Sequence, residues 1–325
     1  MSYINILNNK NRFIFKCLGI LLIFLWIPTV IILMFGGKNN ENVYSAKSSG
    51  KSVIIDGVGG AGTYELDVEE YIVCAVAAQM SPEEEEELLK AFAIIIRTHI
   101  SRLMGDKTTI NASEINLPYV SYNDMQNSWK KNFTAYYNKL NKSVSDTYMQ
   151  VVMCNGELIV PYFHSLSSGA TRNGNEVAAI GDVPYLKSVT SKDDIVNEKY
   201  LSMKTFEYSE FAQMLKKYRE SIIISPENPL EVVSIVERDS AGYVKNIQVG
   251  STLLTGDEFM ECFFLASPNF VVEEYDGKVR VTTKGNGHGL GLSINGAKNM
   301  AYGGKSYKEI LMYYYTDIEV KAYGN

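Results

Sequence analysis

The sequence predicts an α+β fold: a single domain of mixed helices and strands that follows an N-terminal transmembrane helix. Between residues 66 and 100, apolar residues recur at the spacing of helices that pack against a core. From residue 143 onward the pattern changes to short strands separated by hairpin signals. Helical and strand regions that are separated along the chain in this way are typical of the α+β class.

The composition is that of a globular protein. The chain has 325 residues, of which 46% are hydrophobic and 21% charged. Its formal net charge is −6. Because phosphate binding requires a basic surface, this charge argues against nucleic acid as a main partner. It does not exclude a neutral glycan.

An uncharged stretch near the N-terminus predicts a membrane anchor. It runs from Cys17 to Phe35 and is long enough to cross a bilayer as a helix. Basic residues precede it at Lys10, Arg12 and Lys16, which predicts a cytoplasmic N-terminus and a domain outside the cell membrane. No small-x-small cleavage site follows, so we favour an uncleaved single-pass anchor over a removed signal peptide.

The domain organisation follows from these shifts in composition. We expect a cytoplasmic tail over residues 1–16, the anchor over 17–35, a linker rich in Gly, Asn, Ser and Lys over 36–57, and the domain over 58–325. The linker would carry the chain from the membrane to the domain.

The four cysteines indicate no metal-binding motif. They lie far apart in the sequence, at Cys17, Cys74, Cys154 and Cys262. A metal motif would bring Cys or His residues to close spacing. We therefore expect small buried side chains, and we predict no metal and no cofactor.

Two helices joined by a polar corner are predicted over residues 66–100. The corner lies at residues 79–82. Ser81 can cap the second helix, Pro82 suits its first helical position, and Glu84 completes a capping-box pattern. The acidic run over residues 83–87 would then lie in the first turns, where the helix dipole favours negative charge.

The remaining elements are predicted from turn signals and periodicity. Asn155-Gly156 predicts a hairpin between strands over 149–154 and 157–163, and Asp276-Gly277 predicts a second hairpin. The other expected elements are a helix over 125–140, a helical insertion over 193–229, strands over 230–249, a short helix over 254–264 and the second hairpin's strands over 270–274 and 278–283.

Three separated motifs, in matching order, resemble those of the stage II sporulation protein D family, which includes the amidase enhancers. The first is the corner with its flanking helices, where the matching residues are Tyr71, Val76, Ala77, Met80, Leu89, Lys90, Ala91, Ala93, Arg97 and Thr98. In the second, the matches are Tyr162, Phe163, His164, Ser165, Ser167, Gly169 and Thr171. In the third, they are Gly287, His288, Gly289, Gly291, Ser293, Gly296 and Ala297.

The resemblance implies a lytic transglycosylase that acts on glycan strands stripped of their peptides. Such a reaction needs an acid that protonates the glycosidic oxygen and then serves as a base. The family's acid position is Gln79 here, and a carboxamide can hydrogen-bond but cannot donate this proton. Glu83, Glu84 or Asp67 could replace it. Other departures from the family pattern are Phe92, Ile294, Arg172 and the segment EFMECFF, which lacks the usual arginine.

The resemblance also implies glycan-binding residues. Alone, each histidine would more often be structural, but in the family's registers His164 and His288 are expected to line one groove. Lys90 and Arg97 share a helix face, where they are either groove cations or salt-bridge partners. The candidate glycan-binding set is Lys90, Arg97, Tyr162, His164, Ser165, Gly169, Thr171, His288 and Ser293.

Three functional hypotheses follow. The first is binding and remodelling of peptidoglycan glycan strands during spore engulfment, with enzyme status left open. The second is a catalytically inactive glycan-binding partner or activator of a membrane-anchored cell-wall amidase, because Gln79 occupies the acid's position. The third is a structural bridge between membrane proteins. Retention on peptidoglycan separates the first two from the third.

Overall fold

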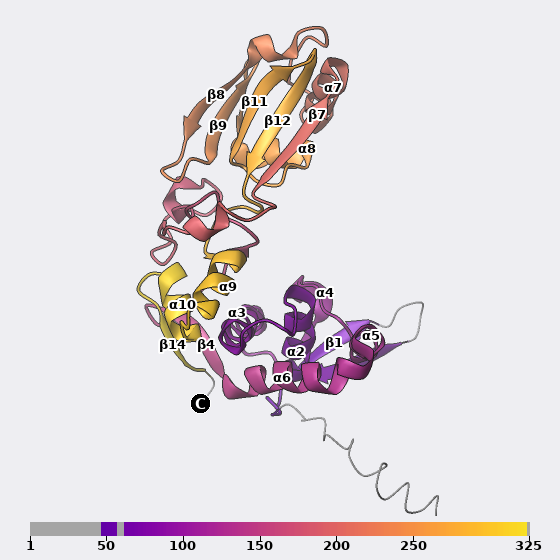
Figure 1. Cartoon of the computed structure of the whole chain (residues 1–325), viewed down its shortest axis with the longest axis vertical. Helices are drawn as coiled ribbons and strands as arrows, with labels where there is room; N and C mark the ends of the chain where they lie inside the picture. The colour runs from indigo at the N-terminus through magenta and orange to yellow at the C-terminus, as the bar shows by residue number, and fades with distance from the viewer. Residues whose placement is uncertain (1–46, 57–61, 324–325) are drawn as a thin grey trace, which may run out of the picture. The chain divides into compact units, whose positions relative to one another are not determined.

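The computed structural model describes residues 47–56 and 62–323, and its mixture of helices with small, mostly antiparallel sheets is that of the α+β class (Figure 1). Within these residues, no helix is both long and apolar enough to cross a membrane. The predicted anchor over residues 17–35, with Cys17, lies outside the described residues.

Helices α2 (Val68–Gln79) and α3 (Glu86–Met104) form the predicted pair. The side chain of Asp67 caps α2 by accepting a hydrogen bond from the N–H of Glu69. The predicted start of α3 was wrong, because the helix begins at Glu86 rather than at Pro82. Ser81 instead forms a turn, in which its side chain and carbonyl accept from the N–H groups of Glu83 and Glu84. The Glu84 carboxylate forms an ion pair with the Lys298 ammonium group at 2.6 Å. A tertiary ion pair thus replaces the capping box.

A small sheet and a group of helices surround this pair. Strand β1 (Ser52–Asp56) pairs antiparallel with β2 (Thr63–Asp67) and parallel with β3 (Thr109–Asn111). Strand β1 therefore begins inside the range where the linker was expected. The helix predicted over 125–140 is two helices with a break at Lys130, which has φ of 49°. The helices here are α4 (Ala112–Ile115), α5 (Tyr122–Trp129) and α6 (Phe133–Asp146).

The hairpin at Asn155-Gly156 is confirmed. Strands β4 (Gln150–Cys154) and β5 (Glu157–Leu158) pair antiparallel, and both turn residues have positive φ. The predicted return strand is shorter than expected, however. After a break, β6 (Phe163–His164) pairs in parallel with β13 (Leu292–Ser293), far along the chain. The C-terminal part adds α9 (Ile294–Tyr302), α10 (Tyr307–Tyr314) and β14 (Glu319–Ala322).

The segment between β6 and β13 forms two three-stranded antiparallel sheets. Their orders are β10-β9-β8 and β11-β12-β7. The hairpin at Asp276-Gly277 is confirmed, but residues 201–206 form a strand inside the predicted helical insertion. The elements are β7 (Leu201–Phe206), α7 (Tyr208–Tyr218), β8 (Val233–Arg238), β9 (Val244–Val249), β10 (Thr252–Thr255), α8 (Gly256–Phe263), β11 (Phe270–Tyr275) and β12 (Lys278–Lys284).

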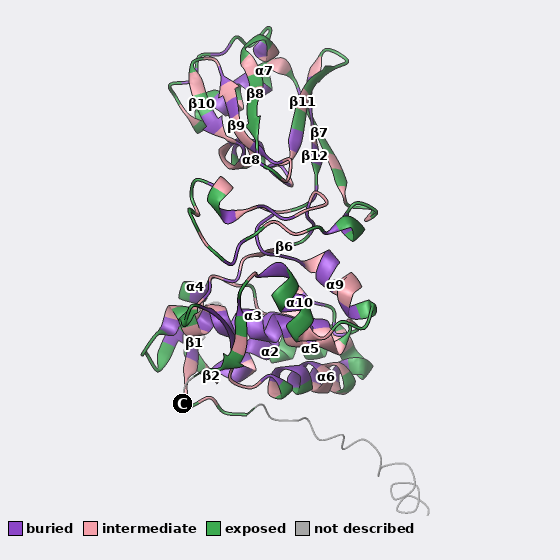
Figure 2. Ribbon diagram, turned by 90° about the vertical axis from the view of Figure 1, so that its left-hand side faces the viewer, coloured by how far each residue is buried: buried purple, intermediate pink, exposed green. Residues whose placement is uncertain are grey.

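The buried apolar residues fall into two hydrophobic clusters. Figure 2 marks buried residues in purple along the ribbon. The first cluster is built on α2 and α3, with α6, β4, α9 and α10 around them. The second lies among α7, α8 and the two antiparallel sheets, where Phe211 and Phe263 stack at 4.5 Å between ring centroids. As predicted, Cys74, Cys154 and Cys262 are buried free thiols.

Candidate functional site

The short sheet of β6 and β13 brings two of the predicted motifs together. Its parallel register places Leu292 opposite Phe163 and Ser293 opposite His164. The glycine-rich loop over residues 285–291 therefore passes directly beside β6. The rings of His164 and His288 lie 5.7 Å apart between centroids, and His288 meets Tyr162 at 5.9 Å. Three predicted site residues thus form one cluster.

Glycines in this loop permit the close approach. Gly287 has φ of 108°, and a Cβ there would lie 2.7 Å from the Cβ of His164. Gly291 has φ of 66°, and a Cβ there would lie 2.1 Å from the carbonyl oxygen of Tyr162. Positive φ at these positions is accessible to glycine at little cost. The loop's sequence is therefore required by how it packs against β6.

His164 is neutral in this environment. Its Nδ1–H donates to the carbonyl of Leu290 at 3.0 Å, which leaves Nε2 as an acceptor. Burial lowers its pKa to about 3, and the neighbouring His288 lowers it further. Its Nε2 has no hydrogen-bond partner within the described part of the chain. An imidazole with this pKa is unprotonated near neutral pH.

His288 is half-buried and has the opposite tautomer. The N–H of Leu290 donates to its Nδ1 at 3.0 Å, so the proton of the neutral ring is on Nε2. Burial lowers its pKa, while Asp257 opposes that change and Arg172 adds to it. Leu290 thus fixes both rings through its carbonyl and its N–H. Neither histidine carries a positive charge that would make it a strong general acid at pH 7.

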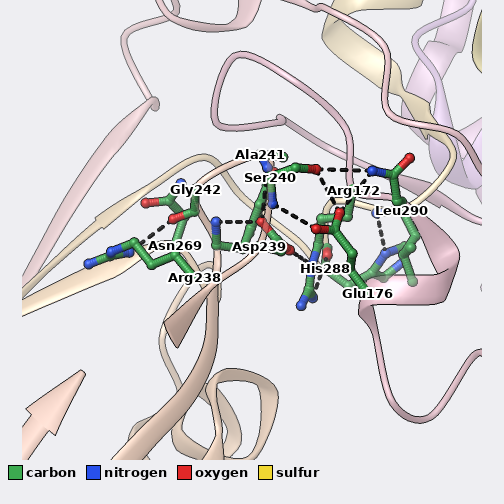
Figure 3. A network of polar contacts seen from close by, with 12 residues as sticks. Arg172, Glu176, Arg238, Asp239, Ser240, Ala241, Gly242, Asn269, His288 and Leu290 are labelled. Carbon is green, nitrogen blue, oxygen red and sulfur yellow. Dashed lines mark hydrogen bonds and ion pairs between the residues drawn. The ribbon is translucent and has the colours of Figure 1, made fainter. Parts of the chain in front are cut away.

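The buried Arg172 binds the backbone of the His288 loop (Figure 3). The Nε of Arg172 binds Asp239 at 2.7 Å, and its Nη1 binds Asp257 at 3.0 Å. The same Nη1 donates to the His288 carbonyl at 3.3 Å, and the Arg172 N–H donates to the carbonyl of Gly289 at 2.8 Å. The sequence signalled Arg172 only as a departure from the family pattern, and its two acidic partners were missed.

Asp194 is a second buried centre that the sequence did not reveal. It accepts hydrogen bonds from the Ser167 hydroxyl at 2.6 Å, the Ser293 hydroxyl at 2.7 Å and the Asn295 amide at 3.0 Å. Ser293 also caps α9 through the N–H of Gly296. The hydroxyl predicted to bind sugar is therefore already bound inside the protein.

The other predicted residues of the second motif differ in access. Thr171 is fully buried, and its hydroxyl accepts from the N–H of Val189 at 3.0 Å. Gly169 has φ of 111° and lies against the side chain of Ile195. Ser165 is exposed beside His164. Of these three, Ser165 is the one that is exposed to solvent.

Lys90 and Arg97 both form ion pairs. Arg97 is buried and binds Glu69 through two nitrogens, at 2.7 and 2.6 Å. Lys90 pairs with Glu87 at 2.8 Å and lies 3.7 Å from Asp146. Of the two alternatives that the sequence left open, the structure therefore places both residues among salt-bridge partners.

Comparison with known proteins agrees with the resemblance of the motifs. The profile of the stage II sporulation protein family matches residues 61–154. The chain is 27% identical to stage II sporulation protein D of Bacillus amyloliquefaciens, covering 94% of this chain and 95% of that one. It is 28% identical to the Bacillus subtilis (strain 168) protein of the same name, over 91% and 92% of the two chains.

The chain thus resembles the stage II sporulation protein D family over most of its length. It is also 25% identical to an amidase enhancer of Bacillus subtilis (strain 168), over 73% of this chain and 38% of the relative. The predicted resemblance is thus confirmed.

Gln79 is the last residue of α2 and is half-buried. Within the described residues, no hydrogen bond is found for its carboxamide. The helix that follows the corner reaches the histidine cluster through Phe92, whose ring meets Phe163 at 5.4 Å edge-on. Met80, next to Gln79, and Leu290, which bonds both histidines, belong to the first hydrophobic cluster. The structure gives no direct contact between Gln79 and the histidines.

The carboxylates that could replace the family's acid are already bound. Glu83 accepts a hydrogen bond from Tyr136. Glu84 pairs with Lys298 and accepts from Tyr302. Asp67 accepts from Ser48 and from the N–H groups of residues 49 and 69. Among the described residues, no group of three or more His, Cys, Asp or Glu side chains could hold a metal ion.

Proposed function

We propose that this protein binds the glycan strands of peptidoglycan and holds them without cleaving them. In this role it would act beside a cell-wall amidase during sporulation, as a partner or an activator. The relation to the amidase enhancer and to the stage II sporulation D proteins supports the cell-wall setting.

The observation that carries the proposal is the chemistry around Gln79. A carboxamide accepts and donates hydrogen bonds, which suits a glycosidic oxygen or an acetamido group. It has no proton to give a leaving oxygen, and it cannot return as a base. Glu83, Glu84 and Asp67 are each bound by other groups, and the lowered pKa of His164 and of His288 keeps both rings unprotonated near pH 7.

The test is incubation of the full-length chain with purified, peptide-stripped glycan strands. Retention of the strands is measured, and anhydro-sugar ends are sought by mass spectrometry. We expect the wild type to retain strands and to make no anhydro ends. The Gln79→Glu variant restores an acid at the corner and is expected to gain cleavage.

A matched control is Gln126→Glu, the same change at an exposed position on α5. It should bind as the wild type does and remain inactive. Anhydro ends made by the wild type would contradict the proposal and assign the acid to another carboxylate. If both proteins bind and neither cleaves, the loss extends beyond Gln79, with Phe92 and Ile294 the next positions to restore.

Cleavage by the wild type is the second candidate function. The observation that favours it is the similarity to stage II sporulation D proteins over more than nine-tenths of the chain. A protein that neither binds nor cleaves would instead support the structural bridge between membrane proteins.

The proposed setting is the outer face of the cell membrane. The uncharged stretch over residues 17–35, with its preceding basic residues, supports a single-pass anchor with a cytoplasmic N-terminus. Protease added to intact cells should then remove the domain and leave the tail. Protection of the domain in intact cells would place it on the other side.

A further inference from the structure

Strand β7 leaves one edge of its sheet unpaired. The sheet has the order β11-β12-β7, and Figure 1 shows β12 between the other two strands. Along β7 the residues are exposed or half-buried, and only Phe206, at its end, is buried. An edge strand presents a row of unpaired N–H and C=O groups, which is a template for pairing with another strand.

The register of β7 with β12 identifies the backbone groups that face outward. The N–H of Gly285 donates to the carbonyl of Tyr200 at 2.8 Å, so the Tyr200 carbonyl points toward the β12 side. In an antiparallel ladder, residues that bond to the partner strand alternate with residues that do not. The N–H and C=O groups of Leu201, Met203 and Thr205 therefore point to the open edge. Within the described residues, no strand pairs with them there.

The side chains on one face of this edge are apolar. Leu201 is 55% exposed and Met203 is 65% exposed. Because side chains alternate between the two faces of a strand, Leu201, Met203 and Thr205 share the face opposite to the buried Phe206. A strand added at this edge would therefore meet apolar side chains on the outer face of the sheet.

The one charged residue of β7 is bound to the end of α8. The Lys204 ammonium group donates to the carbonyls of Phe263 and Phe264, at 3.2 and 2.6 Å. It also lies 5.9 Å from the centroid of the Phe264 ring. Phe264 is 78% exposed and has φ of 51°, which is unusual for an aromatic residue. An exposed aromatic ring thus lies on the side of β7 from which Lys204 extends.

The other edges of these two sheets carry features that hinder pairing. Strand β8 has an irregular register between Ile235 and Arg238, and its exposed residues include charged ones. Strand β11 contains Glu273 and Glu274, and β10 is only four residues long. Bulges, charges and short length are the usual protection of an edge strand. Strand β7 has no bulge in its pairing with β12, and α8 binds its one charge.

The sequence of β7 is complementary to itself in the antiparallel direction. With a two-fold axis at Met203, Leu201 of one copy lies opposite Thr205 of the other. These are the residues whose backbone groups face outward, so each pair can exchange both of its hydrogen bonds. Beyond the strand ends, the same register brings Lys199 of one copy toward Glu207 of the other. Lys199 is exposed and Glu207 is 58% exposed, so the two ends are complementary in charge.

We propose that two copies of this chain associate through β7, in antiparallel orientation about a two-fold axis at Met203. Their three-stranded sheets then form one continuous sheet, in which main-chain hydrogen bonds join the two β7 strands. Met203 of each copy packs against the other on the outer face. Because the same surface is used by both copies, the association closes at a dimer. It goes beyond the proposed glycan-binding function and does not depend on it.

The first experiment traps the paired strands in the full-length chain. Met203→Cys is made in a Cys17→Ser background, oxidised in detergent micelles and separated on a non-reducing gel. The native Cys74, Cys154 and Cys262 are buried. At a hydrogen-bonded pair the two Cα atoms are about 5.5 Å apart, which a disulfide can span. We expect Met203→Cys to form covalent dimers.

The matched control for the crosslink is Val271→Cys in the same background. Val271 and Met203 both lie opposite Thr282 in the ladder, so they share the outer face, and Val271 is also exposed. In the proposed dimer, the two copies of Val271 are separated by five strand spacings, roughly 24 Å. No disulfide spans this distance, so Val271→Cys should remain monomeric on the gel.

The second experiment measures the mass of the protein in the micelle by light scattering. The wild type should have twice the chain's mass of 36.4 kDa. Met203→Lys places two like charges opposite each other at the axis and should reduce the mass to that of one chain at the same concentration. Val271→Lys makes the same change at the far edge of the sheet and should remain dimeric. Far-UV circular dichroism checks that both variants are folded.

Contrary results would overturn the proposed dimer in different ways. A wild type with the mass of one chain would leave the β7 edge to a strand of another protein. A dimer that survives Met203→Lys would place the association elsewhere in the chain. Equal crosslinking of Met203→Cys and Val271→Cys would indicate random collision of thiols. None of these results bears on the retention of glycan strands, so the two proposals can fail separately.

Discussion

At the scale of single residues, His164 makes the stability of the protein depend on pH. Its pKa is lowered to about 3 in the folded state by burial and by His288, whereas an unfolded histidine titrates near its ordinary 6.5. Between these values the unfolded chain binds more protons than the folded one. The free energy of unfolding therefore falls as the pH falls through this window, by up to about 1.4 kcal/mol per pH unit.

We predict that His164→Asn flattens this dependence. The Asn amide can still donate to the Leu290 carbonyl in place of Nδ1 but does not titrate. Urea unfolding at pH 7, 6, 5 and 4.5 measures the slope, which should be shallower in the variant by up to about 1.4 kcal/mol per pH unit. Some slope remains, because the pKa of His288 is also lowered. Identical slopes in the two proteins would contradict the prediction.

The residues that could be identified from the sequence are those whose role depends on the local backbone conformation. The glycines around His288 and the Asn155-Gly156 turn need unusual backbone angles, and such needs show in the sequence. Asp194 could not be found in this way. It acts through Ser167 and Ser293, from segments far along the chain, and only the parallel pairing of β6 with β13 brings these together.

At the scale of elements, α2 and α3 are joined by the buried pair of Glu69 and Arg97. Arg97 also donates to the carbonyls of Val144 and Gln150, so it connects this helix pair to α6 and β4. The Arg97 side chain is 4% exposed and that of Glu69 is 3% exposed. Water therefore cannot solvate the remaining charge if its partner is removed. Such a pair contributes more to the arrangement of the helices than to their net stability.

We predict that Arg97→Met destabilises the protein by about 3–5 kcal/mol, because it leaves the Glu69 carboxylate buried without a partner. The double variant with Glu69→Met should recover most of this loss, since it removes both charges. Urea unfolding of the two single variants and the double variant forms a double-mutant cycle. A double variant as unstable as the sum of the singles would show that the two residues act independently.

The start of α3 shows how an element boundary escapes sequence-based prediction. Ser81, Pro82 and Glu84 form a good local capping pattern, yet the helix begins at Glu86. The Glu84 side chain binds Lys298 of α9, and its carbonyl accepts from Lys139 of α6. These partners come from residues far away in the sequence. Local propensity therefore predicted that a helix exists here, and tertiary contacts set where it begins.

At the scale of the whole molecule, two hydrophobic clusters share one chain, and the Arg172 network joins segments that belong to each. Arg172 follows β6, and the His288 loop precedes β13; both strands pack on the first cluster. Asp239 directly follows β8, and Asp257 lies in the first turn of α8, both in the part of the chain that holds the second cluster. The Arg172 side chain is 1% exposed and that of Asp239 is 0% exposed. Removing Arg172 would leave the buried Asp239 carboxylate without its counter-charge.

We predict that Arg172→Met separates the unfolding of the two clusters. Trp129 packs against the first cluster, so in a Trp26→Phe background its fluorescence reports on that cluster alone, while far-UV circular dichroism reports on both. In Arg172→Met, the circular dichroism transition in urea should begin before the fluorescence transition, with a loss of about 3–5 kcal/mol in the second cluster. Arg280→Met is the control, because Arg280 forms an exposed pair with Glu273 and should cost no more than about 1 kcal/mol. The prediction is contradicted if the fluorescence and circular dichroism transitions of Arg172→Met still coincide and its stability falls no further than that of the control. The Arg172 network would then not couple the two clusters. The His288 loop would instead be held by the packing of its glycines against β6.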